Sequence, residues 1–356
     1  MPPHRPRVRR WQATLIVALA FVAVTAAAGL GWWYAREAPP HQGPIVLISV
    51  NGIAAAELPA YGASRTDTPA IDALASDAVV FERAYTHSTE TLPANASMLS
   101  GQLPLQHGVR DDAGFRLSGD VRTLPELLRN RGFNTGAAVS TFLLRPESGV
   151  AQGFAFFDGE LPSAAGDTAM TVEREGAVTV DAAARWMEQQ DGQRYFLFLQ
   201  VDEPHADPAV TRLTQLLKQR DLYKGATIVL VGDRGEVGSG TSLDERALRV
   251  PLMVKQPMNE GAGRRVPFPV QHIDLVPTIL DLVRAPIPGD LEGRSLRGVL
   301  SDSRATLDDQ PIYSESLTAF YRFGGDPIAA LTEGGYRYVS GASEELVALE
   351  PAASVG

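Results

Sequence analysis

Short apolar runs alternate along this chain with longer runs in which apolar residues recur at helical spacing. The runs "PIVLISV", "YFLFLQV" and "ATIVLVG" are apolar without strict alternation, which is typical of strands buried on both faces. Between them, "TPAIDALASDA" and "PAVTRLTQLLKQRDLY" have the period of amphipathic helices. This rhythm predicts an α/β fold with a mostly parallel sheet sandwiched by helices.

The start of the first helix and the end of the chain carry further signals. Thr68 stands directly before Pro69, so we expect Thr68 to cap a helix whose first residue is the proline. Towards the end, "HIDLVPTILDLV" predicts another helix, whereas "PIYSES", "PIAALTE" and "YRYVSG" predict short strands. We therefore expect an α/β domain at residues 45–305 and a small antiparallel C-terminal subdomain at residues 306–356.

The N-terminal part differs in composition from the rest. Residues 13–34 contain no charged side chain and are long enough to cross a hydrocarbon core of roughly 30 Å. A basic tail, residues 1–12, precedes them, and a Pro-rich linker, residues 35–44, follows. Because cytoplasmic flanks are rich in Arg and Lys, we expect a single-pass anchor in the cell membrane with the remaining chain periplasmic or otherwise extracytoplasmic. A cleaved signal peptide is the alternative, since "TAAAG" offers small residues to a peptidase.

Composition narrows the possible chemistry and partners. The chain has no cysteine, which excludes disulfides, thiolate metal sites and a cysteine nucleophile. From residue 38 onward there are 27 Lys and Arg against 41 Asp and Glu, so the exported part is acidic and poorly suited to nucleic acid. The partners that we expect are the membrane, through the N-terminal helix, and an envelope protein or an anionic ligand.

Polar residues follow three of the predicted strands, at the edge of a parallel sheet where ligands usually bind. Asn51 follows the first run, the segment 202–205 follows the second, and Asp233 with Arg234 follows the third. Thr91 begins the predicted helix "TLPANASMLSG", whose free backbone N–H groups are able to hold an anion. Thr91 is therefore either a nucleophile or an ordinary helix cap, and the residues alone leave both open.

Eight segments resemble the sulfatase family of the alkaline phosphatase superfamily, in the order in which the family has them. They are "LISVNGIAAAELPAYG", "TPAIDALASDAVVFERAYTHS", "TLPANASMLSGQLPLQHGV", "DEPH", "GDRGE", "GSGTSLDERALRVPL", "HIDLVPTILDL" and "LEGRSLRGVL". The resemblance runs from about Ile45 to the end and implies the fold of that superfamily. It also implies a divalent cation, usually calcium, and a nucleophile at a helix N-terminus.

The resemblance places the family's metal ligands on residues that bind metals poorly. The first aspartate falls on Asn51, its neighbour on Gly52, and the late pair on Asp233 and Arg234. Asn51 brings no charge, Gly52 has no side chain, and a guanidinium cannot lose its proton. The resemblance therefore implies metal positions at Asn51 and Asp233 only, a site that is empty, and no cofactor, with Ca²⁺ or another divalent cation required if the chain is active.

The same resemblance implies the catalytic and substrate-binding positions. Thr91 falls on the nucleophile, where no cysteine or serine is present for conversion to formylglycine, and His205 falls on the acid. Arg234 is either free to hold an oxyanion or forms a structural ion pair with Asp233. The candidates for binding a sulfate or phosphate group are Asn95, Arg234, Ser239 and His107.

Two functions follow from these substitutions. The first is a membrane-anchored, sulfatase-like ectodomain whose metal site has decayed, which serves as a non-catalytic binding or scaffolding protein. The second is an active sulfuric or phosphoric ester hydrolase, or a phosphoglycerol or phosphoethanolamine transferase, that uses Thr91. The joint change at Asn51, Gly52, Arg234 and Ser239 favours the first.

Overall fold

The computed structural model describes residues 43–64, 67–161, 173–190, 192–203, 205–235 and 242–349, together with Thr25. The chain divides into two compact units, residues 1–42 and 43–356, and nearly all of the first lies outside the described residues. The proposed basic tail, membrane anchor and most of the linker therefore stay predictions. Among the helices that the structure describes, none is both long and apolar enough to cross a bilayer.

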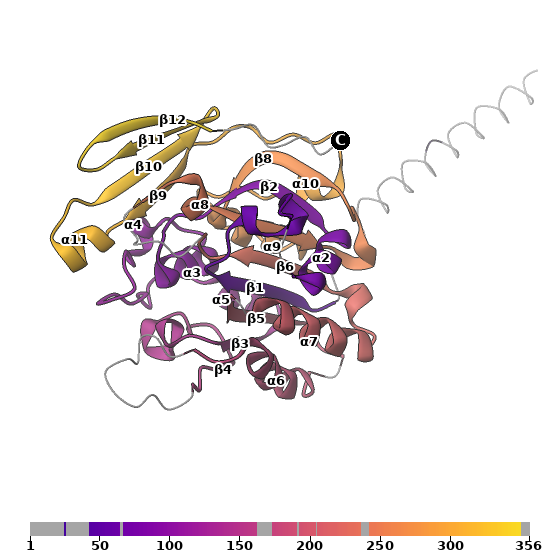
Figure 1. Cartoon of the computed structure of the whole chain (residues 1–356). Coiled ribbons are helices and arrows are strands. Elements are labelled where there is room, and N and C mark those ends of the chain that lie inside the picture. Colours follow the sequence, from indigo (N-terminus) through magenta and orange to yellow (C-terminus); the bar gives the residue numbers. More distant parts are fainter. Residues whose placement is uncertain are drawn as a thin grey trace, which may run out of the picture. The chain divides into compact units, whose positions relative to one another are not determined.

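The predicted parallel sheet is present and has eight strands (Figure 1). Their order is β4, β3, β5, β1, β6, β7, β2, β8, and only β7 runs antiparallel to its two neighbours. The prediction of a mostly parallel sheet is confirmed. The strands are β1 (Ile45–Asn51), β2 (Val79–Tyr85), β3 (Asn134–Val139), β4 (Phe156–Asp158), β5 (Tyr195–Asp202), β6 (Thr227–Gly232), β7 (Arg249–Lys255) and β8 (Arg265–Gln271).

Helices cover both faces of this sheet. Alternate residues of β1 belong to two different apolar clusters, Ile45 and Leu47 to one and Val46 and Ile48 to the other. Because successive side chains of a strand point to opposite faces, each cluster is the core of one face. The helices that pack on the first face are α3 (Thr91–Ser100), α5 (Leu124–Arg129) and α9 (Leu275–Leu282), and those on the second are α2 (Pro69–Ser76), α6 (Gly176–Met187) and α7 (Ala206–Gln219).

The first of these helices begins where we expected, but its cap comes from elsewhere. Thr68 occupies the N-cap position of α2, yet its side chain makes no cap hydrogen bond. The carboxylate of Asp207, in α7, accepts from the backbone N–H groups of Ala70 and Ile71 instead, each at 2.9 Å. The cap expected at Thr68 was wrong because a longer acidic side chain from a packed helix reaches the same N–H groups.

A second, smaller sheet follows near the C-terminus, as predicted. Its four antiparallel strands lie in the order β12, β11, β10, β9. Along the chain, α11 (Thr318–Phe323) lies between β9 and β10. The strands are β9 (Ile312–Ser316), β10 (Ile328–Glu333), β11 (Tyr336–Ser340) and β12 (Glu344–Ala348), and the remaining short helices are α4 (Pro104–His107), α8 (Glu245–Leu248) and α10 (Arg297–Ser301). Both sheets belong to one compact unit, so the boundary proposed at residue 305 stays a prediction.

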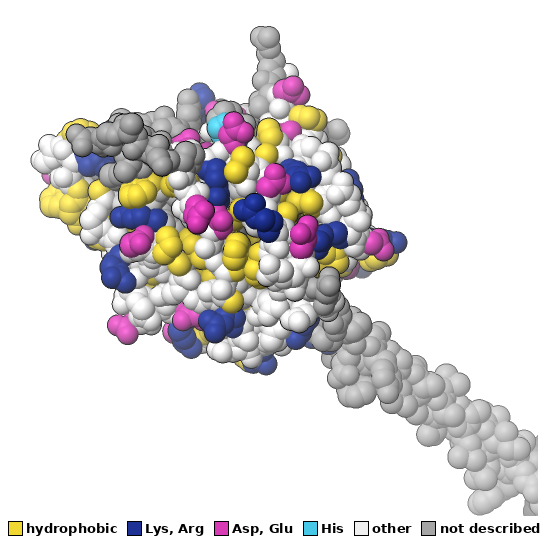
Figure 2. All heavy atoms as spheres, turned by 90° about the horizontal axis from the view of Figure 1, so that it is seen from below, with side chains coloured by type: hydrophobic (Ala, Val, Ile, Leu, Met, Phe, Trp, Pro, Cys, Tyr) yellow, Lys and Arg dark blue, Asp and Glu magenta, His cyan; other side chains and the backbone are white. Residues whose placement is uncertain are grey.

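One face of the described part mixes both signs of charge. Figure 2 shows one face on which Lys and Arg side chains lie among Asp, Glu and apolar side chains, without a large area of a single sign. A protein that binds nucleic acid through its phosphates usually presents a continuous basic area, and this face does not.

Candidate functional site

The carboxyl ends of three adjacent strands bring the predicted residues together. Asn51 ends β1 and lies directly opposite Asp202, the last residue of β5. On the other side of β1, Asp233 follows the end of β6. Thr91 starts α3 and reaches the same place through its hydroxyl. The structure therefore brings Asn51, Asp233 and Thr91 together at one edge of the sheet.

The side chain of Asn51 stands at the centre of the site with all of its polar atoms engaged. Its Oδ1 accepts from Thr91 Oγ1 at 3.2 Å and from Arg234 Nε at 2.9 Å. Its Nδ2 donates to Asp202 Oδ1 at 2.6 Å. A carbonyl oxygen has two lone pairs, and here both face protein donors.

Arg234 is turned towards this centre. Besides Asn51, its guanidinium donates to the backbone oxygen of Thr89 at 3.2 Å. Both hydrogen bonds that the structure describes for Arg234 end on neutral oxygens, whereas we expected either a pair with Asp233 or a free anion binder. A permanently charged group thus lies against the oxygen that would have to bind a metal.

Asp233 is fully buried beside this cation. Its carboxyl oxygens accept from Asn95 Nδ2 at 3.2 Å and from the backbone N–H of Gly52 at 3.3 Å. Burial raises the pKa of Asp233 to about 7, although the charge of Arg234 opposes the rise. Near neutral pH a large fraction of this carboxyl is therefore protonated.

Thr91 does not act as a helix cap. It is the first residue of α3, after the N-cap residue Glu90. Its hydroxyl donates to Asn51, while Asp112 Oδ1 accepts from the backbone N–H of Leu92 at 2.6 Å. Thr91 itself is fully buried. Its place at the start of a ten-residue helix fits the predicted nucleophile position, but the role stays a prediction.

Asn95 is buried and links three elements around the site: α3, β1 and the end of β6. Its Oδ1 accepts from Ser49 Oγ at 2.7 Å, and its Nδ2 donates to the backbone oxygen of Thr91 at 2.8 Å as well as to Asp233. These contacts tie α3 to β1 and to the end of β6. They favour a structural role over the predicted contact with an anion.

His107 is likewise engaged within the protein. Its Nε2 lies 3.0 Å from Ser97 Oγ, and its Nδ1 accepts from the backbone N–H of Val109 at 3.1 Å. Burial lowers the pKa of His107 to about 3, so the ring is neutral at physiological pH. A neutral ring with both nitrogens engaged offers no donor to an anion. The predicted contact of Ser239 with an anion lies outside the described residues.

His205 and Asp202 keep unpaired polar atoms. His205 precedes α7, and within the described chain its buried Nδ1 has no hydrogen-bond partner; the same holds for Asp202 Oδ2. Burial raises the pKa of Asp202, against the hydrogen bonds from Asn51 and Gln200. His205 is thus the predicted residue with the most free hydrogen-bonding capacity.

Sequence reasoning missed a group of carboxylates at the N-terminus of α3. Glu90, the N-cap residue, accepts from Thr318 Oγ1 at 2.6 Å and from Arg322 Nη2 at 2.7 Å. Arg322 also donates to Asp111 at 3.3 Å. Burial and the neighbouring Glu90 raise the pKa of Asp112 well above its usual value. The signal was present as acidic residues at both ends of the motif, in "STE" and in "RDD", and the resulting surroundings are acidic rather than suited to an anion.

The residues present do not fit a divalent cation. Members of the sulfatase family usually use one, and Ca²⁺ takes six to eight oxygen ligands, largely charged. Here Asn51 Oδ1 is taken by two donors, one of them the guanidinium of Arg234, which follows Asp233 in the chain. In the ranges that the structure describes, no three His, Asp or Glu side chains are placed to hold a metal.

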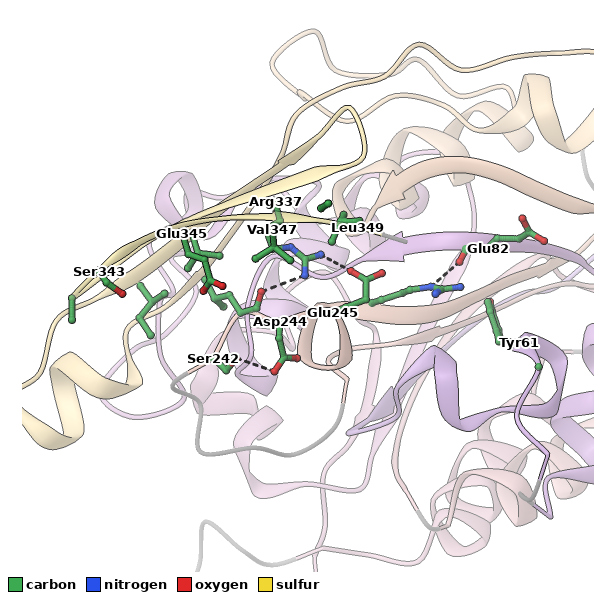
Figure 3. Close-up of a pocket in the computed structure, with 18 of the residues that line it drawn as sticks. Tyr61, Glu82, Ser242, Asp244, Glu245, Arg337, Ser343, Glu345, Val347 and Leu349 are labelled. Carbon is green, nitrogen blue, oxygen red and sulfur yellow. Dashed lines mark hydrogen bonds and ion pairs between the residues drawn. The ribbon is translucent and has the colours of Figure 1, made fainter. Parts of the chain in front are cut away.

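The described structure has one hollow beside this centre and another beneath the C-terminal sheet. One, of about 1060 Å³, is lined by Gly52, Glu57 and Glu203 among others. The other, of about 850 Å³, lies beneath the C-terminal sheet, where Arg337 points to Glu245 (Figure 3). Neither of these two hollows is lined by Thr91 or Arg234.

Comparisons with known proteins agree with this architecture. A profile of the sulfatase family matches residues 44–210, and a profile described as the C-terminal part of N-sulphoglucosamine sulphohydrolase matches residues 241–326. Human N-sulphoglucosamine sulphohydrolase is 27% identical over 173 residues, which are 48% of this chain and 32% of that protein. An ulvan-active sulfatase of Formosa agariphila is 22% identical over 284 residues, 67% of this chain and 54% of that protein. The matches thus span a third to about half of these relatives.

Solved structures share the fold at low sequence identity. A phosphonate monoester hydrolase from Silicibacter pomeroyi has a TM-score of 0.72 at 19% identity, covering 86% of this chain and 89% of that one. A protein in complex with its substrate D-glucosamine-2-N,6-O-disulfate has a TM-score of 0.71 at 15% identity, covering 86% and 90%. These likenesses show the fold, and the two profiles show the family: the chain belongs to the sulfatase family, within the alkaline phosphatase superfamily.

Proposed function

We propose that this chain is a non-catalytic member of the sulfatase family, in which an arginine has replaced the metal and the protein acts by binding. The observation that carries the proposal is the hydrogen bond from Arg234 Nε to Asn51 Oδ1 at 2.9 Å. A metal at this position would need that oxygen and would repel the guanidinium.

The surroundings of the nucleophile support the same proposal. Thr91 is fully buried, and its hydroxyl donates to Asn51, an amide that cannot accept a proton. A threonine hydroxyl attacks an ester only when a base or a metal activates it. We therefore expect the binding function to reside on the surface of the domain.

The location and partner of the domain rest on sequence alone. We propose that residues 13–34 anchor the chain in the cell membrane and that the domain lies outside the cytoplasm, where it contacts another envelope protein. The run of uncharged residues behind a basic tail supports this placement.

The alternative is an active sulfuric or phosphoric ester hydrolase with Thr91 as nucleophile and His205 as acid. One observation favours it: in the described chain, His205 Nδ1 and Asp202 Oδ2 are both buried without a partner. Buried polar atoms are usually paired, and atoms left unpaired at a strand end are available to a ligand.

An activity assay separates the two. We would purify the full chain and measure turnover of 4-nitrophenyl sulfate, 4-nitrophenyl phosphate and a phenylphosphonate ester, with and without added calcium, magnesium, manganese and zinc. The matched control is Thr91→Val, which keeps the shape and removes the hydroxyl. We expect the wild type and this variant to be equally inactive. Metal-dependent turnover that disappears in Thr91→Val would establish the hydrolase instead.

A further inference from the structure

The outer edge of the C-terminal sheet is the least covered part of the described fold. β12 is the last strand of that sheet, and within the described residues no strand pairs with its other side. All five of its residues are exposed, including Leu346 at 67% and Val347 at 37%. An exposed edge with apolar side chains is a ready place for another strand to pair.

A row of apolar side chains leads across the sheet to this edge. The register places Leu331 opposite Tyr338, and Tyr338 opposite Leu346. All three are substantially exposed, at 43%, 41% and 67%. The opposite face of the same strands contributes Val339, Glu345 and Val347 to the cavity beneath the sheet (Figure 3). The row therefore lies on the outer face, away from the cavity.

The hydrogen bonds at the two ends of the β11–β12 pair fix which backbone groups remain free. Leu349 donates to the oxygen of Gly335 at 2.8 Å, and Gly341 donates to the oxygen of Ser343 at 3.2 Å. In an antiparallel pair, hydrogen-bonded and non-hydrogen-bonded positions alternate. Within β12, it follows that the residues bonded to β11 are Glu345 and Val347, and that the outward N–H and C=O groups belong to Glu344, Leu346 and Ala348.

We propose that β12 pairs with β12 of a second copy of this chain, antiparallel and centred on Leu346. In this register each Leu346 faces its counterpart, Glu344 faces Ala348, and Glu345 faces Val347. The outward groups of the two strands then meet in about six backbone hydrogen bonds. The two apolar rows join into one, which buries Leu346 on both sides of a two-fold axis.

The charges of β12 favour the register centred on Leu346 over registers shifted by one or two residues. Centring the pair on Glu345 or on Glu344 would set two identical carboxylates directly opposite each other, which destabilises a strand pair. The strand has glutamates in its first half and apolar residues in its second half, so antiparallel self-pairing about Leu346 sets each glutamate against an apolar residue. This pattern makes a second copy a better partner than a strand of arbitrary sequence. The edge is short, so we expect association in the micromolar range.

Cysteine crosslinking tests the pairing directly, because the chain has no cysteine of its own. The Cα atoms of a hydrogen-bonded pair lie about 5.5 Å apart, within the range of a disulfide. Under oxidation, the full-length Leu346→Cys variant should form a linked dimer at least about tenfold faster than Tyr336→Cys, which is exposed on the same face but one strand further in.

The register is tested by two further single cysteines. In the proposed pair, two copies of Glu345→Cys lie about 8 Å apart and should not crosslink, whereas a mixture of Glu345→Cys with Val347→Cys should. Rapid linking of Glu345→Cys with itself, or a rate for Leu346→Cys no higher than that of Tyr336→Cys, would overturn the proposal.

Sedimentation measures the association without crosslinking. At about 100 μM, the full chain in mild detergent should sediment as a dimer. Leu346→Lys places two ammonium groups on the axis and should weaken dimerisation about tenfold or more, with an unchanged thermal midpoint because its side chain is exposed in the single copy. A wild type that remains monomeric at this concentration contradicts the proposal. The same holds if β12 binds only a foreign peptide and not a second copy of the chain.

Discussion

Two arginines near the carboxyl ends of the strands, Arg174 and Arg234, are held in opposite ways. Arg174 is almost fully buried and has a carboxylate partner: its Nη1 lies 2.5 Å from Asp158 Oδ1. Its Nη2 donates to the backbone oxygen of Val139 at 2.8 Å, which ties β3 to β4. Arg174 is thus one half of a matched ion pair.

Arg234 has no such match among its described hydrogen bonds, which end on the neutral oxygens of Asn51 and Thr89. Its charge instead lowers the pKa values of Asp202 and Asp233 against the effect of burial. One cation shared among several buried carboxyls is the electrostatic arrangement of a metal site. The comparison teaches that Arg174 serves the fold, whereas Arg234 stands where a cation would stand.

The largest effect should come from the matched pair. Arg174→Met leaves Asp158 buried without its counter-charge, so we expect the free energy of unfolding to fall by about 3–5 kcal/mol. Urea unfolding followed by circular dichroism measures it. A loss below about 1 kcal/mol would mean that Asp158 finds another partner or water.

Arg234→Met should cost less, about 1–3 kcal/mol, because the partners that it leaves are neutral oxygens. The loss should be larger at pH 8 than at pH 5, since without the guanidinium the pKa values of Asp202 and Asp233 rise further. Urea unfolding at both pH values tests this. An equal loss at both would show that Arg234 does not stabilise the carboxylates.

Asp233 gives an effect that depends on pH. Its folded pKa of about 7 lies above the ordinary value of 3.8, so the folded state holds the proton more tightly than the unfolded chain. The stability from this group is present below about pH 4 and is lost as pH rises to about 7. Asp233→Asn should therefore gain stability relative to the wild type as pH rises from 5 to 8, by about 2–3 kcal/mol, because the two states differ by nearly one bound proton over about two pH units. If the difference in stability between Asp233→Asn and the wild type stayed constant with pH, the pKa of Asp233 in the folded protein would have its ordinary value.

The smallest effect should come from an exposed pair. Arg122 lies 2.8 Å from Asp290, with both side chains more than half exposed. Arg122→Gln should leave the unfolding midpoint unchanged within error, because water and salt screen such pairs. A clear loss of stability would show that the contribution of an ion pair to stability does not depend on its burial in this protein. It would weaken the comparison between Arg174 and Arg234.

Much of the fold was predictable because the pattern of apolar residues is strong. "YFLFLQV" and "ATIVLVG" became β5 and β6 with every residue buried, and the order of the family's segments placed Asn51, Thr91 and Asp233 at one edge of the sheet. The capping role expected for Thr68 was wrong because Asp207 takes it. Asp207 lies 137 residues from Ala70 in the sequence, so local sequence does not reveal this contact.

The orientation of side chains within the site was not predictable. We expected Arg234 either to form an ion pair with its neighbour Asp233 or to hold an oxyanion, but its guanidinium donates to Asn51 Oδ1 instead. The role of Glu90 likewise depends on Thr318 and Arg322, which only folding of the C-terminal part brings near. Residue identity therefore predicted which residues meet at this edge of the sheet, whereas tertiary contacts decide what their side chains are able to do.

The most direct test of the central claim is the metal content of the purified full chain, measured by elemental mass spectrometry after incubation with calcium, magnesium, manganese and zinc. The matched comparison is the double variant Asn51→Asp with Arg234→Asn, which removes the cation and adds a carboxylate. If Arg234 stands in for the metal, the wild type will hold substoichiometric metal and the double variant will gain calcium. Near-stoichiometric metal in the wild type, lost in Asp233→Asn, would contradict the account.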